Sequence, residues 1–332
     1  MKRLLAFLAL LAVLFAAVAG GLAWYAQRPL ALTTPAVEFL LPAGTPMKQA
    51  ARLIQAAGVD VEPRLLEWLA RLTGKDRAIK AGSYEVAAGI TPWGLILKLS
   101  RGDVSQGELA VIEGWTFRQL RAALAAHPDL LHDSAGLSDA QVLARLGAAE
   151  AHPEGLFLPD TYLFDKQSGE LHLLSRAYRA MQGQLTQAWA ARDPQLPLAS
   201  PYQALILASI VEKETGRRED RPVIASVFVN RLRAGMRLQT DPAVIYGLGP
   251  AFDGNLRKRD LLADSPYNTY TRPGLPPTPI ALPGIESLRA ALQPGASAYL
   301  YFVARGDGSS EFSRNLDEHN RAVARYQKRI KG

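Results

Sequence analysis

The carboxyl group best placed for acid–base chemistry is that of Glu214, near the end of a helix predicted over residues 200–216. It follows Leu207 by seven residues, Ile210 by four and Val211 by three, so it shares their apolar face of the helix. Burial against that face and the negative end of the helix dipole both disfavour the ionised carboxylate, so we expect a raised pKa. A raised pKa is what a proton donor needs near neutral pH.

Glu214 also has a structural alternative, which is an ion pair with an arginine. Arg217, Arg218 and Arg231 are all near enough along the chain to supply one. A single glutamate on one helix is therefore a weak signal of catalysis when taken alone. Glu212, two positions earlier, projects from another face of the helix, so we expect it to have different partners.

Both ends of this helix carry sequence signals. Ser200 is a good N-cap, Pro201 suits the first helical position, and Gln203 completes a capping box. Gly216 is expected to be a left-handed C-cap. These signals place Glu214 in the last turn.

Polar and aromatic side chains gather at the end of the next predicted helix, over residues 225–232, and in the loops after it. Amides and hydroxyls hydrogen-bond sugar hydroxyls, and tyrosine rings stack on the apolar faces of sugars, so we predict a sugar-binding site. The alternative is that Asp241 only caps a following helix and that the tyrosines belong to the core. The predicted sugar-binding residues are Asn230, Gln239, Thr240, Asp241, Tyr246, Tyr267 and Asn268.

Other kinds of chemistry have little support in the sequence. The absence of cysteine excludes disulfides, thiolate metal sites and a cysteine nucleophile. The 5 histidines are scattered without His-Glu-x-x-His spacing, so we expect no metal and no other cofactor. The net charge of +7 favours an anionic polymer or surface as a neighbour, but no basic run reaches five residues and nucleic acid is not expected.

The N-terminus predicts export from the cytoplasm. Lys2 and Arg3 precede 22 uncharged residues, Leu4 to Tyr25. At about 1.5 Å per residue, a helix of this length spans a bilayer core, with the two charges on the cytoplasmic side. A cleaved signal peptide is the alternative, because Ala17-Val18-Ala19 fits a cleavage site. The apolar stretch is longer than the roughly 7–15 residues of a signal peptide, which favours an anchor.

Residues 37–104 predict a small unit with the order strand, helix, helix, strand. The strand candidates are Val37–Leu41 and Ser83–Val86. The first helix between them is expected to begin with Thr45 as its N-cap and Pro46 at its first position.

The second helix of that unit, over residues 62–72, is expected to bury Leu65, Leu66 and Leu69. Residues 127–154 are expected to be mainly helical, with loops at Pro128 and Gly136. Strands and helices mixed in this way predict the α+β fold class. The predicted parts are a cytoplasmic tip (1–3), a transmembrane anchor (4–25), a linker (26–36), the small unit (37–104) and a larger mixed α+β domain (105–332).

Several long motifs resemble those of the YceG-like endolytic murein transglycosylases, which are single-span proteins of the bacterial inner membrane. The resemblance covers nearly the whole chain, and it departs from the family at Leu156 and Leu158, where aromatic residues are common. The motifs are EGLFLPDTY (154–162), ASIVEKET (208–215), VFVNRL (227–232), MRLQTDP (236–242), YNTY (267–270) and residues 315–320.

The resemblance implies a glycan-binding domain similar to LysM at residues 37–104 and a transglycosylase catalytic domain at 105–332. It implies that Glu214 is the catalytic acid and that His319 braces the site. The implied reaction cleaves the β-1,4 bond between N-acetylmuramic acid and N-acetylglucosamine without water and leaves a 1,6-anhydro end. The implied setting is the periplasmic face of the inner membrane, where peptidoglycan synthases would be partners and nascent glycan strands would be terminated.

Two other functions remain open from the sequence. One is a non-catalytic, membrane-anchored scaffold that binds peptidoglycan, which the position of Glu214 on an apolar face disfavours. The other is a hydrolytic muramidase, which requires a second carboxylate. Glu212, Glu219 and Asp241 are candidates for that second group.

Overall fold

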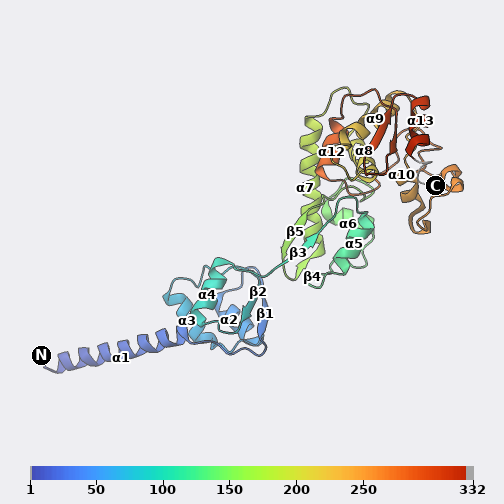
Figure 1. The fold of residues 1–332 in the computed structure, drawn as a ribbon. Helices are drawn as coiled ribbons and strands as arrows, with labels where there is room; N and C mark the ends of the chain where they lie inside the picture. The colour runs from blue at the N-terminus through green and yellow to red at the C-terminus, as the bar shows by residue number, and fades with distance from the viewer. Residues whose placement is uncertain (1, 327–332) are drawn as a thin grey trace. The chain divides into compact units, whose positions relative to one another are not determined.

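The computed structural model of the protein describes residues 2–326 and divides into two compact units (Figure 1). Unit 1 comprises residues 1–108 with 163–168, and unit 2 comprises residues 109–162 with 169–332. Met1, in the predicted cytoplasmic tip, and residues 327–332, in the predicted catalytic domain, lie outside the described residues. Both units contain helices and short strands, so the prediction of a mixed α+β fold is confirmed.

Unit 1 contains a long N-terminal helix and a two-stranded sheet with three further helices. The strands β1 and β2 pair antiparallel along their whole length. Alternate residues of β1 are buried, and one of them, Phe39, stacks on Tyr84 of β2 with ring centroids 5.7 Å apart. The elements are α1 (Lys2–Gln27), β1 (Ala36–Leu41), α2 (Met47–Ala56), α3 (Pro63–Leu72), β2 (Gly82–Ala87) and α4 (Pro92–Arg101).

Helix α2 begins later than predicted. Its first residue is Met47, and Pro46 occupies the N-cap position without a side-chain capping bond. The Thr45 hydroxyl instead donates to the carbonyl of Pro42 at 2.7 Å. The prediction of Thr45 as the N-cap was therefore wrong, because that hydroxyl closes the turn before the helix.

Helix α3 has an exposed leucine where we expected a buried one. Leu66 and Leu69 are buried as predicted, together with Ala70. Leu65 is 41% exposed, so the prediction that it is buried was wrong. It precedes Leu66 by one residue, about 100° around a helix of 3.6 residues per turn, and therefore turns away from the core.

The remainder of the chain is mainly helical, and its strands are short and paired two by two: β3 with β5, β4 with β6, and β7 with β8. The elements are β3 (Gln106–Ala110), α5 (Phe117–Ala125), β4 (Leu130–Leu131), α6 (Asp139–Leu146), β5 (Thr161–Asp165), β6 (Ser168–Gly169), α7 (Glu170–Ala190), α8 (Pro201–Glu214), α9 (Arg221–Arg233), α10 (Asp241–Leu248), η1 (Gly249–Ala251), α11 (Lys258–Leu262), α12 (Ile285–Leu292), β7 (Tyr301–Ala304), β8 (Ser310–Ser313) and α13 (Leu316–Tyr326).

Residues 127–154 are less helical than predicted, since α6 is the only helix among them. The predicted loops at Pro128 and Gly136 do lie in the stretch before it, but the residues between them form turns and the short strand β4 rather than a helix. Helix α6 itself begins with a capping box between Ser138 and Gln141.

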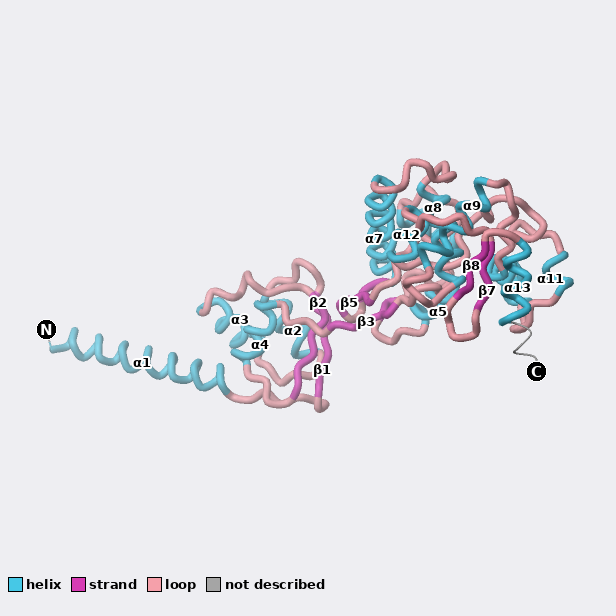
Figure 2. The backbone as a smooth tube through the Cα atoms, turned by 45° about the horizontal axis from the view of Figure 1, so that its top comes forward, coloured by secondary structure: helices cyan, strands magenta, loops and turns pink. Residues whose placement is uncertain are grey.

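Helix α8 contacts α7, α9, α10 and α12 of unit 2, and Figure 2 shows it beside α7, α9 and α12. All residues from Ala204 to Val211 are buried, so this stretch of the helix is enclosed on every side. This is the pattern of a core helix, and the predicted single apolar stripe was too narrow. Glu214 is the last residue of this enclosed helix.

The start of α8 is capped largely as predicted. The Ser200 hydroxyl accepts a hydrogen bond from the Gln203 N–H at 3.3 Å, so the N-cap prediction is confirmed. The Gln203 side chain, however, accepts from the N–H of Ala199 rather than from that of Ser200. The capping box is therefore only half formed.

Candidate active site

The chain leaves α8 directly after Glu214 in an extended conformation. Thr215 is the C-cap, with φ −149° and ψ 136°, and its hydroxyl accepts a hydrogen bond from the Arg217 N–H at 3.0 Å. The prediction of a left-handed Gly216 was wrong, because an extended exit needs no left-handed residue.

The Glu214 carboxyl group is held by a threonine of a distant loop. The Thr240 hydroxyl donates to Glu214 Oε1 at 2.6 Å. Thr240 is only 1% exposed, and its own N–H donates to the Thr269 hydroxyl at 3.0 Å. The Thr269 hydroxyl in turn donates to the Thr240 carbonyl. Thr240 is thus fixed before it contacts Glu214.

Burial raises the pKa of Glu214 to about 7. The hydrogen bond from Thr240 and the charge of Arg231 act in the opposite direction, while the nearby Asp241 carboxylate raises the pKa further. Within the described part of the chain, no lysine or arginine forms an ion pair with Glu214. Arg217, one of the arginines considered for that pair, contacts Glu219 instead at 3.8 Å. The pKa of the carboxyl group therefore lies closer to neutral pH than that of a free glutamic acid.

Arg231 shapes the loop that carries Thr240. It is 7% exposed, and its guanidinium donates to the carbonyls of Leu238 and Leu300 at 2.7 Å each. Gln239, which follows Leu238, has a φ of 51°. This value is unusual for a residue other than glycine and is typical of functional sites. The Gln239 side chain accepts from Arg231 at 3.4 Å.

Asp241 follows in the first turn of α10 and has a tyrosine partner. The Tyr270 hydroxyl donates to Asp241 Oδ1 at 2.5 Å. Burial and the contact with Asp241 raise the pKa of Tyr270, so its hydroxyl remains a donor. The predicted residues Gln239, Thr240 and Asp241 therefore do lie around Glu214.

His319 and Tyr301 lie next to Arg231. Their rings stack with centroids 5.2 Å apart, and the Arg231 guanidinium lies over the Tyr301 ring at 5.1 Å. Burial lowers the pKa of His319, and so does the charge of Arg231. This arrangement holds His319 close to the residues that shape the site.

Two of the predicted sugar-binding residues are occupied by backbone contacts. Asn230 donates its amide hydrogens to the carbonyls of Ser297 and Tyr299, at 2.9 and 3.0 Å. Asn268 is 1% exposed. Its amide nitrogen contacts the carbonyls of Asp260, Leu261 and Ala263. These contacts make both asparagines supports for loops.

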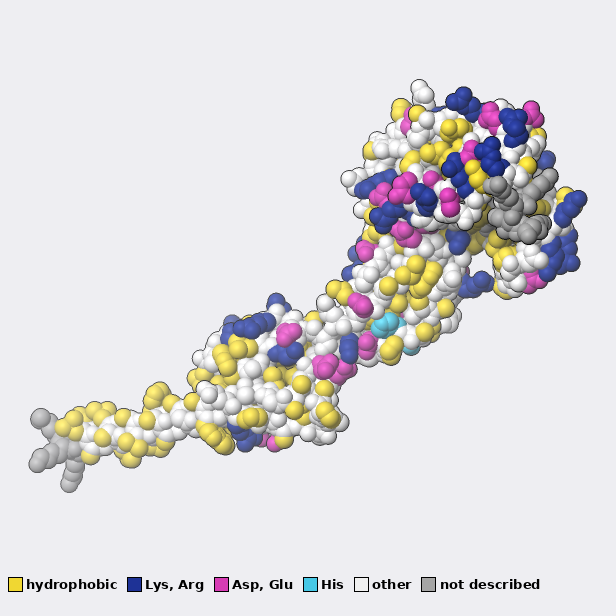
Figure 3. Space-filling view, in the orientation of Figure 1, with side chains coloured by type: hydrophobic (Ala, Val, Ile, Leu, Met, Phe, Trp, Pro, Cys, Tyr) yellow, Lys and Arg dark blue, Asp and Glu magenta, His cyan; other side chains and the backbone are white. Residues whose placement is uncertain are grey.

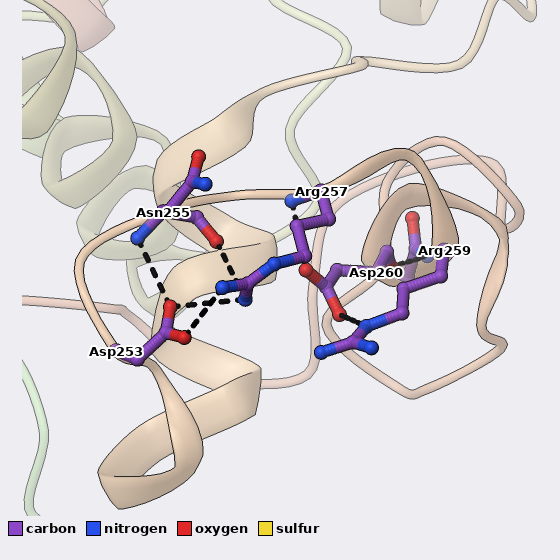
Figure 4. Close-up of polar contacts among 6 residues, drawn as sticks. Asp253, Asn255, Arg257, Arg259 and Asp260 are labelled. Carbon is purple, nitrogen blue, oxygen red and sulfur yellow. Dashed lines mark hydrogen bonds and ion pairs between the residues drawn. The ribbon is translucent and has the colours of Figure 1, made fainter.

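The loop that Asn268 supports is ordered further by its own ion pairs (Figure 4). Arg257 contacts both carboxylate oxygens of Asp253, and its N–H donates to Asp260 at 2.8 Å. The adjacent Lys258 and Arg259 belong to the short helix α11. The loop thus presents several cations on unit 2.

A second buried carboxyl group lies beside a cavity of about 700 Å³. Glu154 is 3% exposed and accepts hydrogen bonds from the Phe117 N–H at 2.8 Å and from the Tyr246 hydroxyl at 3.0 Å. Burial raises its pKa to about 7. Tyr246 meets Tyr267 edge to face, with centroids 5.0 Å apart, and both rings line the cavity.

Glu214 lies close to this cavity but is not one of its lining residues. Lys213 and Pro242 line the cavity, and they adjoin Glu214 and Asp241 in the chain. The predicted residues thus form two groups, one around Glu214 and one around the pair of tyrosines. The described residues contain no group of three or more His, Asp or Glu side chains arranged to hold a metal.

Sequence reasoning missed four residues of these two groups as site residues. All four, Glu154, Arg231, Thr269 and Tyr270, lie within the quoted motifs, which was the available signal. Thr269 and Arg231 act through contacts with Thr240 and its loop, and only the folded chain shows those contacts.

Glu212 has entirely different partners from Glu214. It is 5% exposed, like Arg221, and the two form an ion pair at 2.9 Å. Its other oxygen accepts from the Gly284 N–H at 2.9 Å. Glu212 therefore joins α8 to α9 and to the start of α12.

Comparison with known proteins decides the family, since the model of the YceG-like family matches residues 39–325. The chain belongs to this family. The match begins inside β1, includes Glu154 and Glu214, and leaves α1 outside.

Several relatives of this YceG-like chain are known. It is 32% identical to the endolytic murein transglycosylase of Bacillus subtilis (strain 168), over 87% of this chain and 84% of that one. It is 25% identical to the endolytic murein transglycosylase of Streptococcus pneumoniae (strain D39), over 86% of this chain and 57% of that one. A crystal structure of a YceG-like protein from Listeria monocytogenes aligns with a TM-score of 0.53 and 30% identity, over 86% of this chain and 98% of that one.

The raised pKa of Glu214 predicts a pH-dependent cost in stability. Between its ordinary value of 4.5 and about 7, the folded protein binds more protons than the unfolded chain. The free energy of unfolding therefore falls as pH rises through that window. Glu214→Gln should remove this contribution and raise stability at pH 8 by on the order of 2 kcal/mol, with little effect at pH 4.

Thermal unfolding of the detergent-solubilised protein across this pH range measures the effect. Glu219→Gln is the matched control, because Glu219 is 75% exposed. Equal stability of Glu214→Gln and the parent at pH 8 would show that Glu214 ionises without penalty.

Glu212→Gln should destabilise the fold while preserving the chemistry. It leaves the buried Arg221 without its closest carboxylate, and breaking such a pair costs about 3 kcal/mol. Urea unfolding should show this loss. Folded Glu212→Gln, assayed well below its unfolding temperature, should retain far more activity than Glu214→Gln. Equal activity loss in the two variants would contradict the separation of their roles.

Proposed function

We propose that this chain is an endolytic lytic transglycosylase of peptidoglycan. It would cleave the β-1,4 bond between N-acetylmuramic acid and N-acetylglucosamine in nascent strands and leave 1,6-anhydro ends. The names of the Bacillus and pneumococcal relatives support the activity. The single observation that carries the proposal is the Glu214 carboxyl group, with a pKa of about 7 and no ion pair within the described residues.

Glu214 would act first as an acid and then as a base. Its protonated form donates to the glycosidic oxygen, and the bond from that oxygen to C1 of the muramic acid breaks. The muramyl 6-hydroxyl then bonds to C1 and returns its proton to the Glu214 carboxylate. A pKa near the ambient pH suits both steps, because the group must give up a proton and take one back. The Thr240 hydroxyl keeps one carboxyl oxygen in place.

Asp241 keeps a hydrolytic muramidase as the second candidate. Hydrolysis requires a second carboxylate to activate water or to attack C1. Glu212 is committed to Arg221, and Glu219 is largely exposed. Asp241 is the one of these three whose charge acts on Glu214. A non-catalytic scaffold is disfavoured. Burial of Glu214 raises its pKa and costs stability, and glycan binding alone does not require a buried carboxyl group.

The sugar contacts are proposed at both groups of residues. Gln239, Thr240 and Asp241 would position the sugar that reacts at Glu214. Tyr246 and Tyr267 line the neighbouring cavity and would stack on an adjacent sugar. Asn230 and Asn268 would contribute by holding the loops in place.

Unit 1 supplies a second proposed glycan contact. Its order of β1, α2, α3 and β2 agrees with a LysM-like domain. A groove of about 570 Å³ lies between the loop that follows β1 and the loop that precedes β2. Thr45, Lys48, Arg71, Arg77 and Lys80 are among its lining residues. Cations and a hydroxyl there would suit a glycan that carries carboxylates.

We propose that α1 anchors the chain in the bacterial inner membrane. Leu4–Gln27 is the one helix, among the residues the structure describes, that is long and apolar enough to cross a bilayer. Lys2 and Arg3 would keep the N-terminus cytoplasmic and place both units in the periplasm. Peptidoglycan synthases, which make nascent strands at that membrane face, would be the partners.

Purified glycan strands test the reaction directly. Incubation with the full chain in detergent should release products with 1,6-anhydro ends, identified by mass spectrometry. Glu214→Gln should lower the rate by at least about 10²-fold, since general acid–base catalysis contributes 10²- to 10⁴-fold. Glu219→Gln should leave it unchanged.

Asp241→Asn separates the two candidate reactions. If the protein is a transglycosylase, Asp241→Asn should still make anhydro ends, because the substrate supplies the nucleophile. Reducing ends from the parent protein, lost in Asp241→Asn, would instead establish hydrolysis. Undiminished activity in Glu214→Gln would remove Glu214 from the mechanism.

A further inference from the structure

The α3 helix of unit 1 presents an apolar stripe that the fold leaves uncovered. Leu65, Trp68 and Leu72 are spaced three and four residues apart, so they lie on one face of the helix. They are 41%, 58% and 67% exposed. A helix with one apolar face in the core needs no second one, so this stripe calls for a separate partner.

Helix α3 also has a separate charged stripe, so its exposed apolar residues are confined to one face. Arg64, Glu67 and Arg71 share the spacing of the apolar residues, one position earlier in the chain. Glu67 and Arg71 form an ion pair at 2.8 Å. Helix α3 thus has a core face, a charged face and an apolar face.

The apolar face of α3 adjoins the proposed membrane anchor. The C-terminal half of α1 packs on α3 and α4, and Tyr25 donates to the carbonyl of Glu62 at the start of α3. A groove of about 550 Å³ runs between the two helices. Its lining is almost wholly apolar and includes Leu65, Trp68 and Leu72 from α3, with Val18, Gly21, Leu22 and Trp24 from α1.

The depth of these α1 residues identifies what covers the groove. A bilayer core of about 30 Å accommodates about 20 helical residues, so a span that starts at Leu4 leaves the hydrocarbon near Ala23. Val18 and Gly21 then lie inside the hydrocarbon edge. Leu65, Trp68 and Leu72 line the same groove as Val18 and Gly21.

The flanking residues fit the membrane–water boundary. Trp24 is 68% exposed, and tryptophan is enriched at this boundary. Arg28 is the first charged residue after the apolar stretch. The Arg28 guanidinium lies over the rings of Trp24 and Tyr25, at 5.7 Å each. Hydrophobic side chains cover α1 along its length, and more of them appear on the globular part of unit 1 (Figure 3).

We propose that the apolar stripe of α3, formed by Leu65, Trp68 and Leu72, inserts into the outer leaflet of the membrane that α1 spans. Lipid acyl chains fill the groove between α1 and α3. Unit 1 is then held on the bilayer by two elements, so its glycan-binding groove has a fixed height above the membrane. The inference rests on the proposed anchor and is independent of Glu214.

Single cysteines test this insertion, because the chain has none of its own. Spin labels are attached to Trp68→Cys and Leu72→Cys in the full chain, in vesicles of phosphatidylethanolamine and phosphatidylglycerol. Collisions with oxygen, which concentrates in lipid, are compared with collisions with a water-soluble nickel chelate. Leu14→Cys reports on the anchor, and Glu85→Cys on the outer face of the sheet reports on water.

Insertion predicts that labels at 68 and 72 have an oxygen-to-nickel collision ratio several-fold above that at Glu85 and close to that at Leu14. Arg64→Cys, on the charged face of the same helix, should give a lower ratio than either. Water-like ratios at 68 and 72 with a lipid-like Leu14 would overturn the inference and leave the anchor intact. Low collision rates with both reagents would mean a protein contact and would overturn it too. A water-like Leu14 would remove the anchor and the insertion together.

Discussion

The hydrogen bond from the Thr240 hydroxyl to the Glu214 carboxyl group joins two segments that lie 26 residues apart, and the geometry of the site depends on it. Thr240 is available because Thr269 holds its backbone and Arg231 holds the loop before it. Glu214 is held in place because α8 is buried over Ala204–Val211 and ends at Glu214. Buried neutral contacts therefore position the carboxyl group, and no cation of residues 2–326 forms an ion pair with it.

The same burial makes the site costly to maintain. The pKa of Glu214 and that of Glu154 are both raised to about 7, so each carboxyl group opposes folding once it ionises. A destabilised functional site is tolerated when the surrounding scaffold is firm. The buried pair of Glu212 and Arg221 provides part of that firmness next to the site, since it ties α8 to α9. Two glutamates of one helix turn thus have opposite effects on stability, since Glu212 forms a buried ion pair and Glu214 opposes folding once it ionises.

Local signals predicted much of the fold and the central residue. The N-cap at Ser200 and the raised pKa of Glu214 followed from spacing, dipole direction and side-chain chemistry, which act within one helix. The exposure of Leu65 did not follow, because apolar periodicity shows which residues share a helix face but not whether that face packs into the core. The hydrogen bonds of Glu154 with Tyr246 did not follow either, since they join segments 92 residues apart. Spacing along the chain predicts which residues share a helix face, and only tertiary packing decides what that face meets.

The central claim is that Glu214 is an acid whose pKa lies close to neutrality because its carboxyl group is buried. Difference infrared spectroscopy across a pH titration measures this directly, since the protonated carboxyl stretch that disappears in Glu214→Gln belongs to that residue. For the buried carboxyl group we expect this band to be lost with a midpoint of about pH 7. A midpoint near 4.5, the value of a free glutamic acid, would contradict it.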